Sequence, residues 1–87
     1  MTITEACHEA TCRLEESPLI INSGRCFQWA TIVFDLVEGS KIWGHNVDGF
    51  GHSFIEHEGR FYDAESPEGV KDWQDLPFFQ RVYENAR

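Results

Sequence analysis

The chain has 87 residues, of which 41% are hydrophobic and 14% aromatic, a composition typical of one small folded domain over residues 1–87 and not of a disordered segment. Its formal net charge of −8 at pH 7 argues against electrostatic binding to nucleic acid or to an anionic membrane, and would suit a basic partner protein. No apolar run approaches the roughly 20 residues that span a bilayer, and residues 1–10 lack the basic and apolar regions of a signal peptide. Three cysteines cannot all pair, so we expect reduced thiols and a cytoplasmic location (the host cytoplasm if the protein is phage-encoded).

Residues 1–18 are polar and only weakly periodic. They predict a flexible N-terminal arm or a short helix over residues 4–15, followed by a short extended segment at residues 19–21. The cysteines and the histidine of this region are too few and too widely spaced to predict a metal site. These residues are Cys7, His8 and Cys12.

The stretch from Asn22 to Glu38 predicts one helix, expected over residues 24–38. Asn22 and Ser23 are suitable N-caps, because a side-chain oxygen can accept an unpaired backbone N–H there, and Gly39 can close the other end in the left-handed conformation. Apolar residues cover most of the circumference, so this should be the central core helix, covered on nearly all sides. They are Cys26, Trp29, Ala30, Val33, Phe34 and Val37, flanked by Phe27, Ile32 and Leu36.

Cys26 lies in the first turn of this predicted helix. The free backbone N–H groups and the dipole at a helix N-terminus favour negative charge, so a thiolate would be stabilised there. The alternative is that Cys26 is one more small residue of the buried stripe, since free cysteine is among the most buried residue types. The helix alone favours this second interpretation, and the residues that follow change the balance.

After Gly39 the pattern becomes that of a small sheet. Residues 40–45 and 52–57 predict two strands joined by a glycine-rich turn over residues 46–51. A two-residue turn at Glu58-Gly59 then predicts a returning strand over residues 60–64.

The remainder of the chain predicts a break in the sheet at residues 66–69 and a short helix that begins at Pro77. The aromatic residues of this segment should close the core from one side. The predicted fold class is therefore α+β, with a central core helix packed on a small antiparallel sheet of three or more strands.

The Glu58-Gly59 turn also predicts which side chains meet. If residue 57 pairs with 60 and residue 54 with 63, then His52 and Asp63 become diagonal neighbours on one face, within reach of a side-chain hydrogen bond. A carboxylate beside a histidine fixes its tautomer and steadies the imidazolium, and with Cys26 this makes the parts of an activated thiol nucleophile. Two alternatives stay open: Glu65, directly across from His52, could take the third role, and Asp63 could simply pair with Arg60 or cap the next turn.

The segments G-R-C-F-Q-W-A and G-H-S-F-I-E-H-E-G-R-F-Y-D-A resemble the papain-like cysteine superfamily, closest in style to transglutaminase-like and NlpC-type peptidase domains in small bacterial or phage versions. The resemblance covers about residues 22–65 and implies a minimal papain-like or transglutaminase-like core. It implies that Cys26 is the nucleophile, His52 the general base and Asp63 the orienting acid. No glutamine stands where papain-type enzymes keep their oxyanion donor. The residues that could replace it beside the Cys26 N–H are Asn22, Gln28, Trp29 and Trp43.

The function predicted from these residues is cysteine-dependent acyl chemistry on an amide of a protein or peptide: hydrolysis, deamidation or acyl transfer, without a metal or cofactor. The rival is a non-catalytic acidic binding or inhibitor protein on the same scaffold, of phage or mobile-element origin. A metal site of His45, Asp48 and His52 matches no recognised spacing. We expect His45 and His57 to be surface residues.

Overall fold

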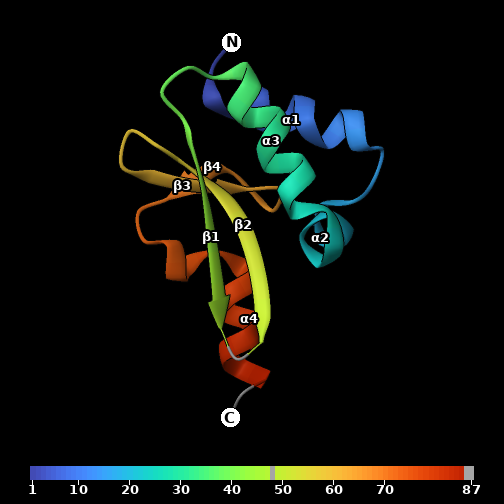
Figure 1. The fold of residues 1–87 in the computed structure, drawn as a ribbon, viewed down its shortest axis with the longest axis vertical. Coiled ribbons are helices and arrows are strands. Elements are labelled where there is room, and N and C mark those ends of the chain that lie inside the picture. Colours follow the sequence, from blue (N-terminus) through green and yellow to red (C-terminus); the bar gives the residue numbers. More distant parts are fainter. Residues whose placement is uncertain (48, 86–87) are drawn as a thin grey trace.

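The computed structural model describes residues 1–47 and 49–85 and has an α+β fold in which helices pack on a four-stranded antiparallel sheet (Figure 1). This confirms the predicted fold class. The helical elements are α1 (Ile3–Leu14), α2 (Pro18–Ile20), the π-helical turn η1 (Ile21–Arg25), α3 (Cys26–Leu36), the 3-10 turn η2 (Trp73–Asp75) and α4 (Pro77–Asn85). The strands are β1 (Lys41–Val47), β2 (Phe50–His57), β3 (Arg60–Asp63) and β4 (Ser66–Val70). No helix in this part of the chain combines the length and the apolar character that crossing a bilayer requires.

The sheet has the strand order β1-β2-β3-β4. Its β2–β3 register places His57 opposite Arg60 and Glu56 opposite Phe61, as the two-residue turn predicted. That turn works because Glu58 and Gly59 both have positive φ, 51° and 80°, as the tightest hairpin connections require.

The predicted break at residues 66–69 is wrong, because Ser66–Val70 forms β4. This strand contains Pro67, which cannot donate a ladder hydrogen bond. Since β4 lies at the edge of the sheet and has a partner on one side only, the missing N–H can face away from the ladder.

The N-terminal segment is an element of the core and not a flexible arm. Thr2 and Glu5 cap α1 reciprocally through side chain and backbone. Its inner face, made by Ala6, Cys7 and Ala10, is fully buried, with at most 1% exposed. Small side chains on that face let α1 approach α3 closely, and the two helices lie side by side in Figure 1.

The helical run that leads into α3 starts earlier than predicted. Ser17 caps it, and Pro18 occupies the first turn, so the extended segment expected at residues 19–21 is helical. Neither predicted N-cap acts as one: the Asn22 amide donates to Glu65 and the Ser23 hydroxyl donates to the Leu19 carbonyl. The α-helix proper runs from Cys26 to Leu36, inside the predicted 24–38.

The prediction that α3 is covered on nearly all sides is wrong. Trp29, Ala30 and Val33 are buried against α1 and the sheet, as the apolar stripe indicated. Phe27 and Phe34, however, are 62% and 48% exposed, so no element of residues 1–47 and 49–85 fully covers that side of the helix. The helix lies on one face of the molecule and is not enclosed by it.

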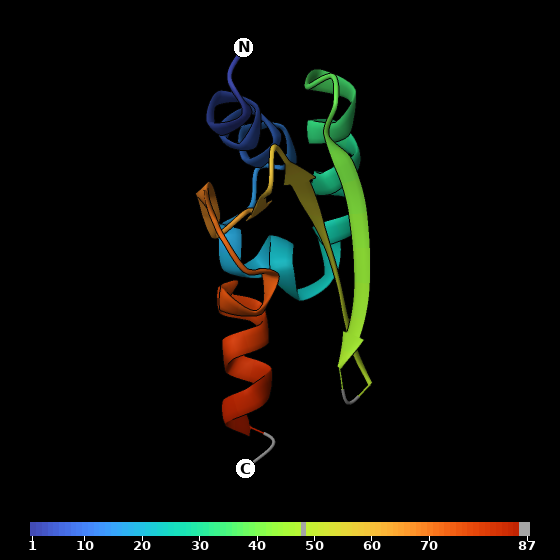
Figure 2. The same ribbon diagram turned by 90° about the vertical axis from the view of Figure 1, so that its left-hand side faces the viewer.

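The sheet separates two apolar clusters. Ile55 and Tyr62 pack with α1 and α3 on one face, whereas Phe54 packs with Leu76 and Phe79 on the other. Neighbouring strand residues point to opposite faces, so β2 contributes to both clusters. Figure 2 shows α4 beside the distal half of the β1–β2 hairpin, away from α1.

Candidate active site

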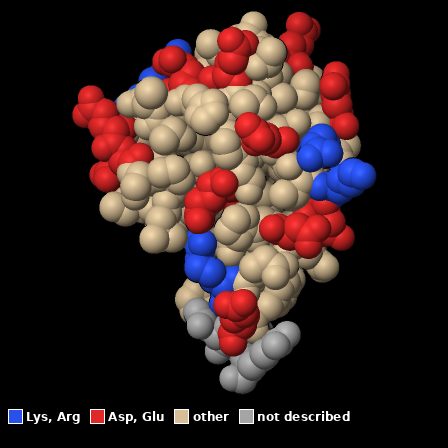
Figure 3. Space-filling view, turned by 180° about the vertical axis from the view of Figure 1, so that it is seen from behind, with Lys and Arg blue, Asp and Glu red and all other residues tan. Residues whose placement is uncertain are grey.

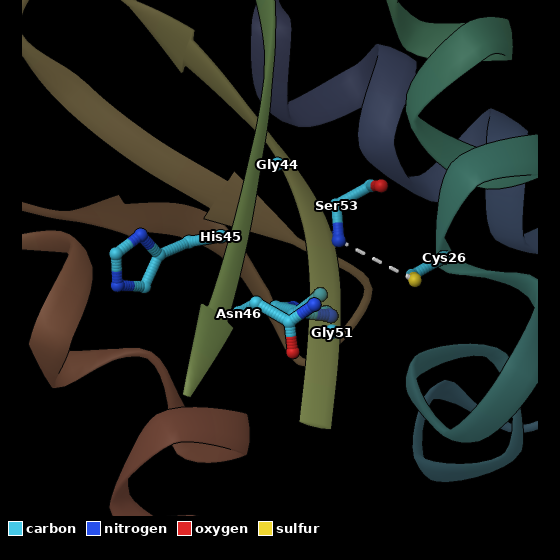
Figure 4. Close-up of a pocket in the computed structure, with 7 residues that line it drawn as sticks. Cys26, Gly44, His45, Asn46, Gly51 and Ser53 are labelled. Carbon is cyan, nitrogen blue, oxygen red and sulfur yellow. Dashed lines mark hydrogen bonds between the residues drawn. The ribbon is translucent and has the colours of Figure 1, made fainter. Parts of the chain in front are cut away.

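Cys26 is the first residue of α3 and is half-buried beside β2. Its sulfur accepts a hydrogen bond from the backbone N–H of Ser53 at 3.4 Å (Figure 4). Because this N–H is given to sulfur, it points to the edge of β2 that faces away from β1. Strand β3 pairs with β2 only at residues 55–57, so the start of α3 meets a stretch of β2 that β3 leaves uncovered.

His52 and Asp63 form the predicted pair. The Nε2 atom of His52 lies 2.9 Å from Oδ2 of Asp63, and both side chains are 0% exposed. The other carboxylate oxygen, Oδ1, accepts the backbone N–H of Glu65 at 3.0 Å. With Nε2 donating to the carboxylate, the basic nitrogen of the neutral ring is Nδ1. Nδ1 is buried and has no hydrogen-bond partner of regular geometry within the described part of the chain.

The surroundings shift the pKa values of the thiol and the imidazole in opposite directions. Burial raises the pKa of Cys26, but hydrogen bonding with His52 and with the Ser53 N–H outweighs it, so this pKa lies below the ordinary thiol value. Burial lowers the pKa of His52, but the hydrogen bonds with Asp63 and Cys26 outweigh it, and this pKa is raised. Both shifts favour a thiolate beside an imidazolium, which is the reactive form of such a pair.

Aromatic side chains hold the His52 ring in place. Phe78 of α4 stacks on it with centroids 4.3 Å apart and planes 15° from parallel. Phe79 meets it edge-on at 5.5 Å, and Phe54 of β2 lies at 5.9 Å. These contacts exclude water from one side of the imidazole and leave its hydrogen bond to Asp63 buried.

Glu65, the rival for the third role, is engaged elsewhere. Its carboxylate accepts two hydrogen bonds from the Arg81 guanidinium, at 2.7 and 3.0 Å, and one from the Asn22 amide at 2.9 Å. The hydrogen bonds from Arg81 are the main reason that the pKa of Glu65 is lowered, against an opposing effect of burial. Of the two carboxylates, Asp63 is therefore the one that orients His52.

Three of the four predicted oxyanion donors, Asn22, Trp29 and Trp43, donate hydrogen bonds to other side chains. The Trp29 indole donates to Thr11 at 3.1 Å, and the Trp43 indole donates to Glu56 at 2.8 Å. The Gln28 amide pairs with Arg25, and the Asn22 amide is the donor to Glu65. Gln28 accepts from Arg25 through its amide oxygen, so its amide N–H groups remain a predicted oxyanion donor.

The expected free helix N-terminus is also absent around Cys26, because the helical residues 18–25 precede it. The N–H groups that lower the pKa of the thiol are those of Ser53 on the neighbouring strand and of Phe27, the next residue in α3. The negative charge of the thiolate is therefore stabilised by individual N–H groups, one of them from the sheet, and not by a free helix N-terminus.

A cavity of about 350 Å³ opens beside the sulfur (Figure 4). It is lined by Cys26, Gly44, His45, Asn46, Gly51, His52 and Ser53. The sequence pattern did not point to Gly44 and Asn46 of β1 as lining residues, although a glycine inside a predicted strand was a usable signal. His45 is exposed as expected, and its ring turns away from the thiol and packs on Trp73, with centroids 4.4 Å apart.

The other cysteines have different environments. All three are free thiols. Cys7 is buried in α1, and burial raises its pKa to about 12, whereas Cys12 is exposed. For the alternative metal set, Asp48 lies outside the described residues, and among the residues the structure does describe no group of three His, Cys, Asp or Glu is placed to hold a metal ion.

Comparison with known proteins adds no assignment: no family model, no curated protein and no solved structure matches this chain. The resemblance to the papain-like superfamily therefore stays a prediction, carried by short segments of the sequence. The contacts among Cys26, His52 and Asp63 stand independently of it.

Proposed function

We propose that the protein is a cysteine-dependent enzyme of acyl chemistry, with Cys26 as nucleophile, His52 as general base and Asp63 as the residue that orients His52. One observation carries this proposal: His52 is buried with Nε2 on the Asp63 carboxylate, which leaves Nδ1 for the Cys26 thiol, whose pKa is lowered by hydrogen bonding with His52. Cys26 and His52 both line the cavity described above.

The proposed reaction begins with attack of the Cys26 thiolate on the carbonyl carbon of an amide. The S–C bond forms, and the carbonyl electron pair moves to the oxygen, which the Ser53 N–H beside the sulfur can stabilise. The C–N bond then breaks, and the leaving amine takes the proton of the His52 imidazolium. Water or a second amine attacks the resulting thioester and gives its proton to Nδ1, and the S–C bond breaks to release the product.

A second candidate function is supported by the charge of the molecule. The chain has 15 Asp and Glu against 7 Lys and Arg, and Figure 3 shows carboxylates spread over the back of the molecule. A non-catalytic acidic protein that binds a basic partner would carry this surface. In that case the thiol would be a structural group with no special reactivity.

The two candidates differ in the reactivity of Cys26. We expect iodoacetamide at pH 6 to 7 to alkylate Cys26 of the native protein faster than Cys12, because the lowered pKa of Cys26 leaves a larger thiolate fraction. Peptide mapping by mass spectrometry measures both rates in one sample. Cys7, buried and with its pKa raised to about 12, is an internal control that should react only after unfolding.

Two variants connect that reactivity to the proposed triad. His52→Ala should abolish the preference for Cys26, and Asp63→Asn should reduce it by roughly tenfold, the equivalent of about one pKa unit. Asp35→Asn, an exposed position on α3, is the matched control and should leave the rates unchanged. Alkylation of Cys12 first, with Cys26 protected until denaturant is added, would refute the enzyme and favour the acidic binding protein.

A further inference from the structure

The floor of the cavity beside Cys26 is a part of the β1–β2 ladder that lacks side chains at two positions. Gly44 pairs with Ser53, and Asn46 pairs with Gly51. Paired residues share a face of the sheet, as do alternate residues of one strand. His52 and Phe54 point to the α4 face, so these four residues lie on the opposite face, where α3 packs against Ile55.

The backbone does not require either glycine. Neither has a positive φ, and the β1–β2 pairing runs from Lys41–Glu56 to Val47–Phe50 without a bulge. Packing does not require them either: a Cβ at Gly44 would meet no atom within 4 Å, and one at Gly51 would meet only the Asn46 side chain, at 3.9 Å. Glycine inside a strand costs about 0.5–1 kcal/mol relative to alanine. The remaining reason for glycine here is close approach of a ligand or another backbone.

The residues that line the cavity indicate which kind of ligand it could bind. The lining contains no Asp, Glu, Lys or Arg among the described residues, so apart from the proposed thiolate and imidazolium of Cys26 and His52 it offers no partner for a charged group. Asn46 and Ser53 each supply a donor and an acceptor, which match the N–H and C=O of a peptide group. Gly44 and Asn46 are exposed on β1, as is Gly51 on β2, so the cavity is an open trough through which a chain can pass. Cys26 and His52 also line the trough, so the reacting group of a bound ligand lies at this end of it.

We propose that this trough binds the main chain of an uncharged, extended polypeptide segment, held flat against Gly44 and Gly51 so that one of its carbonyl groups lies at the Cys26 sulfur. This inference rests on the proposed function and names its substrate class: a peptide main chain. Gly44 and Gly51 determine specificity by leaving room for the substrate backbone. Asn46 hydrogen-bonds one of its peptide groups.

The test compares two electrophiles that react at the same sulfur. Iodoacetamide needs only the thiolate, whereas an acetyl-Gly-Gly chloromethyl ketone must also place its peptide in the trough. In both reactions the thiolate displaces a halide from a CH₂ group, so an S–C bond forms and a carbon–halogen bond breaks. Gly44→Val adds a branched side chain that strands accommodate well, and it points into the trough. Lys41→Val, an exposed position at the start of β1 that does not line the trough, is the matched control.

We expect Gly44→Val to lower the rate of Cys26 labelling by the peptidyl ketone by at least about tenfold, because a small misplacement of a bound reactant has large effects on rate. Its iodoacetamide rate should stay within about twofold of the unmodified protein, as should both rates of Lys41→Val. An unchanged peptidyl rate in Gly44→Val, with Cys26 still reactive to iodoacetamide, would overturn the trough and leave the proposed function standing. A Cys26 that is inert to iodoacetamide in the unmodified protein would overturn both. Thermal unfolding followed by circular dichroism checks that each variant is folded, and Gly44→Ala, which adds a single methyl group, should show a smaller loss in the same direction.

Discussion

At the scale of single residues, the carboxylate of Glu65 has the most consequential partners outside the proposed triad. It joins Asn22 of η1 and Arg81 of α4, while its own backbone N–H donates to Asp63. Three segments that are distant in sequence are thereby connected two residues from Asp63, the partner of His52. The Glu65 side chain is 19% exposed and that of Arg81 is 40%, so solvent screens part of this ion pair.

Glu65→Gln should therefore lower stability in a pH-dependent way. The pKa of Glu65 in the folded protein is lowered from 4.5, chiefly by the hydrogen bonds from Arg81. A lowered folded pKa means that the contribution is fully present above pH 4.5 and is lost as the pH falls through the folded value. We expect the variant to lose about 1 kcal/mol of unfolding free energy at pH 6, after allowance for screening, and the difference to shrink towards pH 3. Urea denaturation at both pH values measures it.

The control for this prediction is Glu68→Gln, an exposed carboxylate on β4. It should change stability little at either pH. A deficit of Glu65→Gln that is the same at pH 3 as at pH 6 would show that the hydrogen-bond geometry of Glu65 matters and its charge does not.

At the scale of the strands, the glycines divide into two kinds. Gly69 in β4 has a φ of 81°, and a Cβ there would lie 2.7 Å from the Tyr62 ring, so the fold itself requires glycine at this position. Gly44 in β1 has an ordinary φ and open space around it. Gly69 is therefore required by the packing of the sheet, whereas Gly44 leaves space that a ligand can occupy.

This difference predicts opposite effects of the same substitution. Gly69→Ala should destabilise the protein by about 2 kcal/mol or more, because strain at positive φ adds to the clash with Tyr62. Gly44→Ala should be neutral or stabilise the protein by up to about 1 kcal/mol, since alanine loses less backbone entropy on folding. Chemical denaturation of the two variants in parallel measures both. A loss in Gly44→Ala as large as that in Gly69→Ala would contradict the assignment of Gly44 to binding.

At the scale of the whole molecule, the sheet divides the structure into two small cores, and the proposed triad lies between them. The cluster under α1 and α3 contains Trp29 and Ile55, while the cluster under α4 contains Phe54 and Phe79. The molecule is elongated, with principal extents of 40 × 28 × 17 Å, and its described ends lie at opposite poles (Figure 1). Cys26 and His52 therefore depend on both halves for their relative position.

Removal of α1 should consequently unfold the protein. Deletion of residues 1–14 would remove Ala6, Cys7 and Ala10, all buried, and would expose Trp29 and its neighbours to water. A domain of this size has only a few kcal/mol of stability to lose. Circular dichroism should show no cooperative thermal transition in the truncated chain. Arg13→Ala, an exposed substitution in the same helix, is the control and should melt like the unmodified protein. A cooperative transition in the deletion variant would contradict this prediction and would support the flexible N-terminal arm predicted from the sequence.

The sequence alone was sufficient where short-range signals decide the structure. The Glu58-Gly59 turn predicted the register of β2 and β3, and the register predicted that His52 meets Asp63. Gly39 takes the left-handed conformation expected after the helix, and Pro77 begins α4. Each of these follows from backbone conformations that a few adjacent residues prefer or forbid.

The tertiary structure decided everything that depends on a distant partner. Asn22 was as good an N-cap as Ser17, but Asn22 pairs with Glu65, 43 residues away, and the helix begins at Ser17 instead. The indoles that looked available to an oxyanion are held by Thr11 and Glu56, across 18 and 13 residues. A side chain with several possible partners is committed by the packing of whole elements, which local preferences do not encode. The cavity at Gly44 forms only where β1, β2 and α3 meet. For the same reason it could be recognised only in the folded molecule.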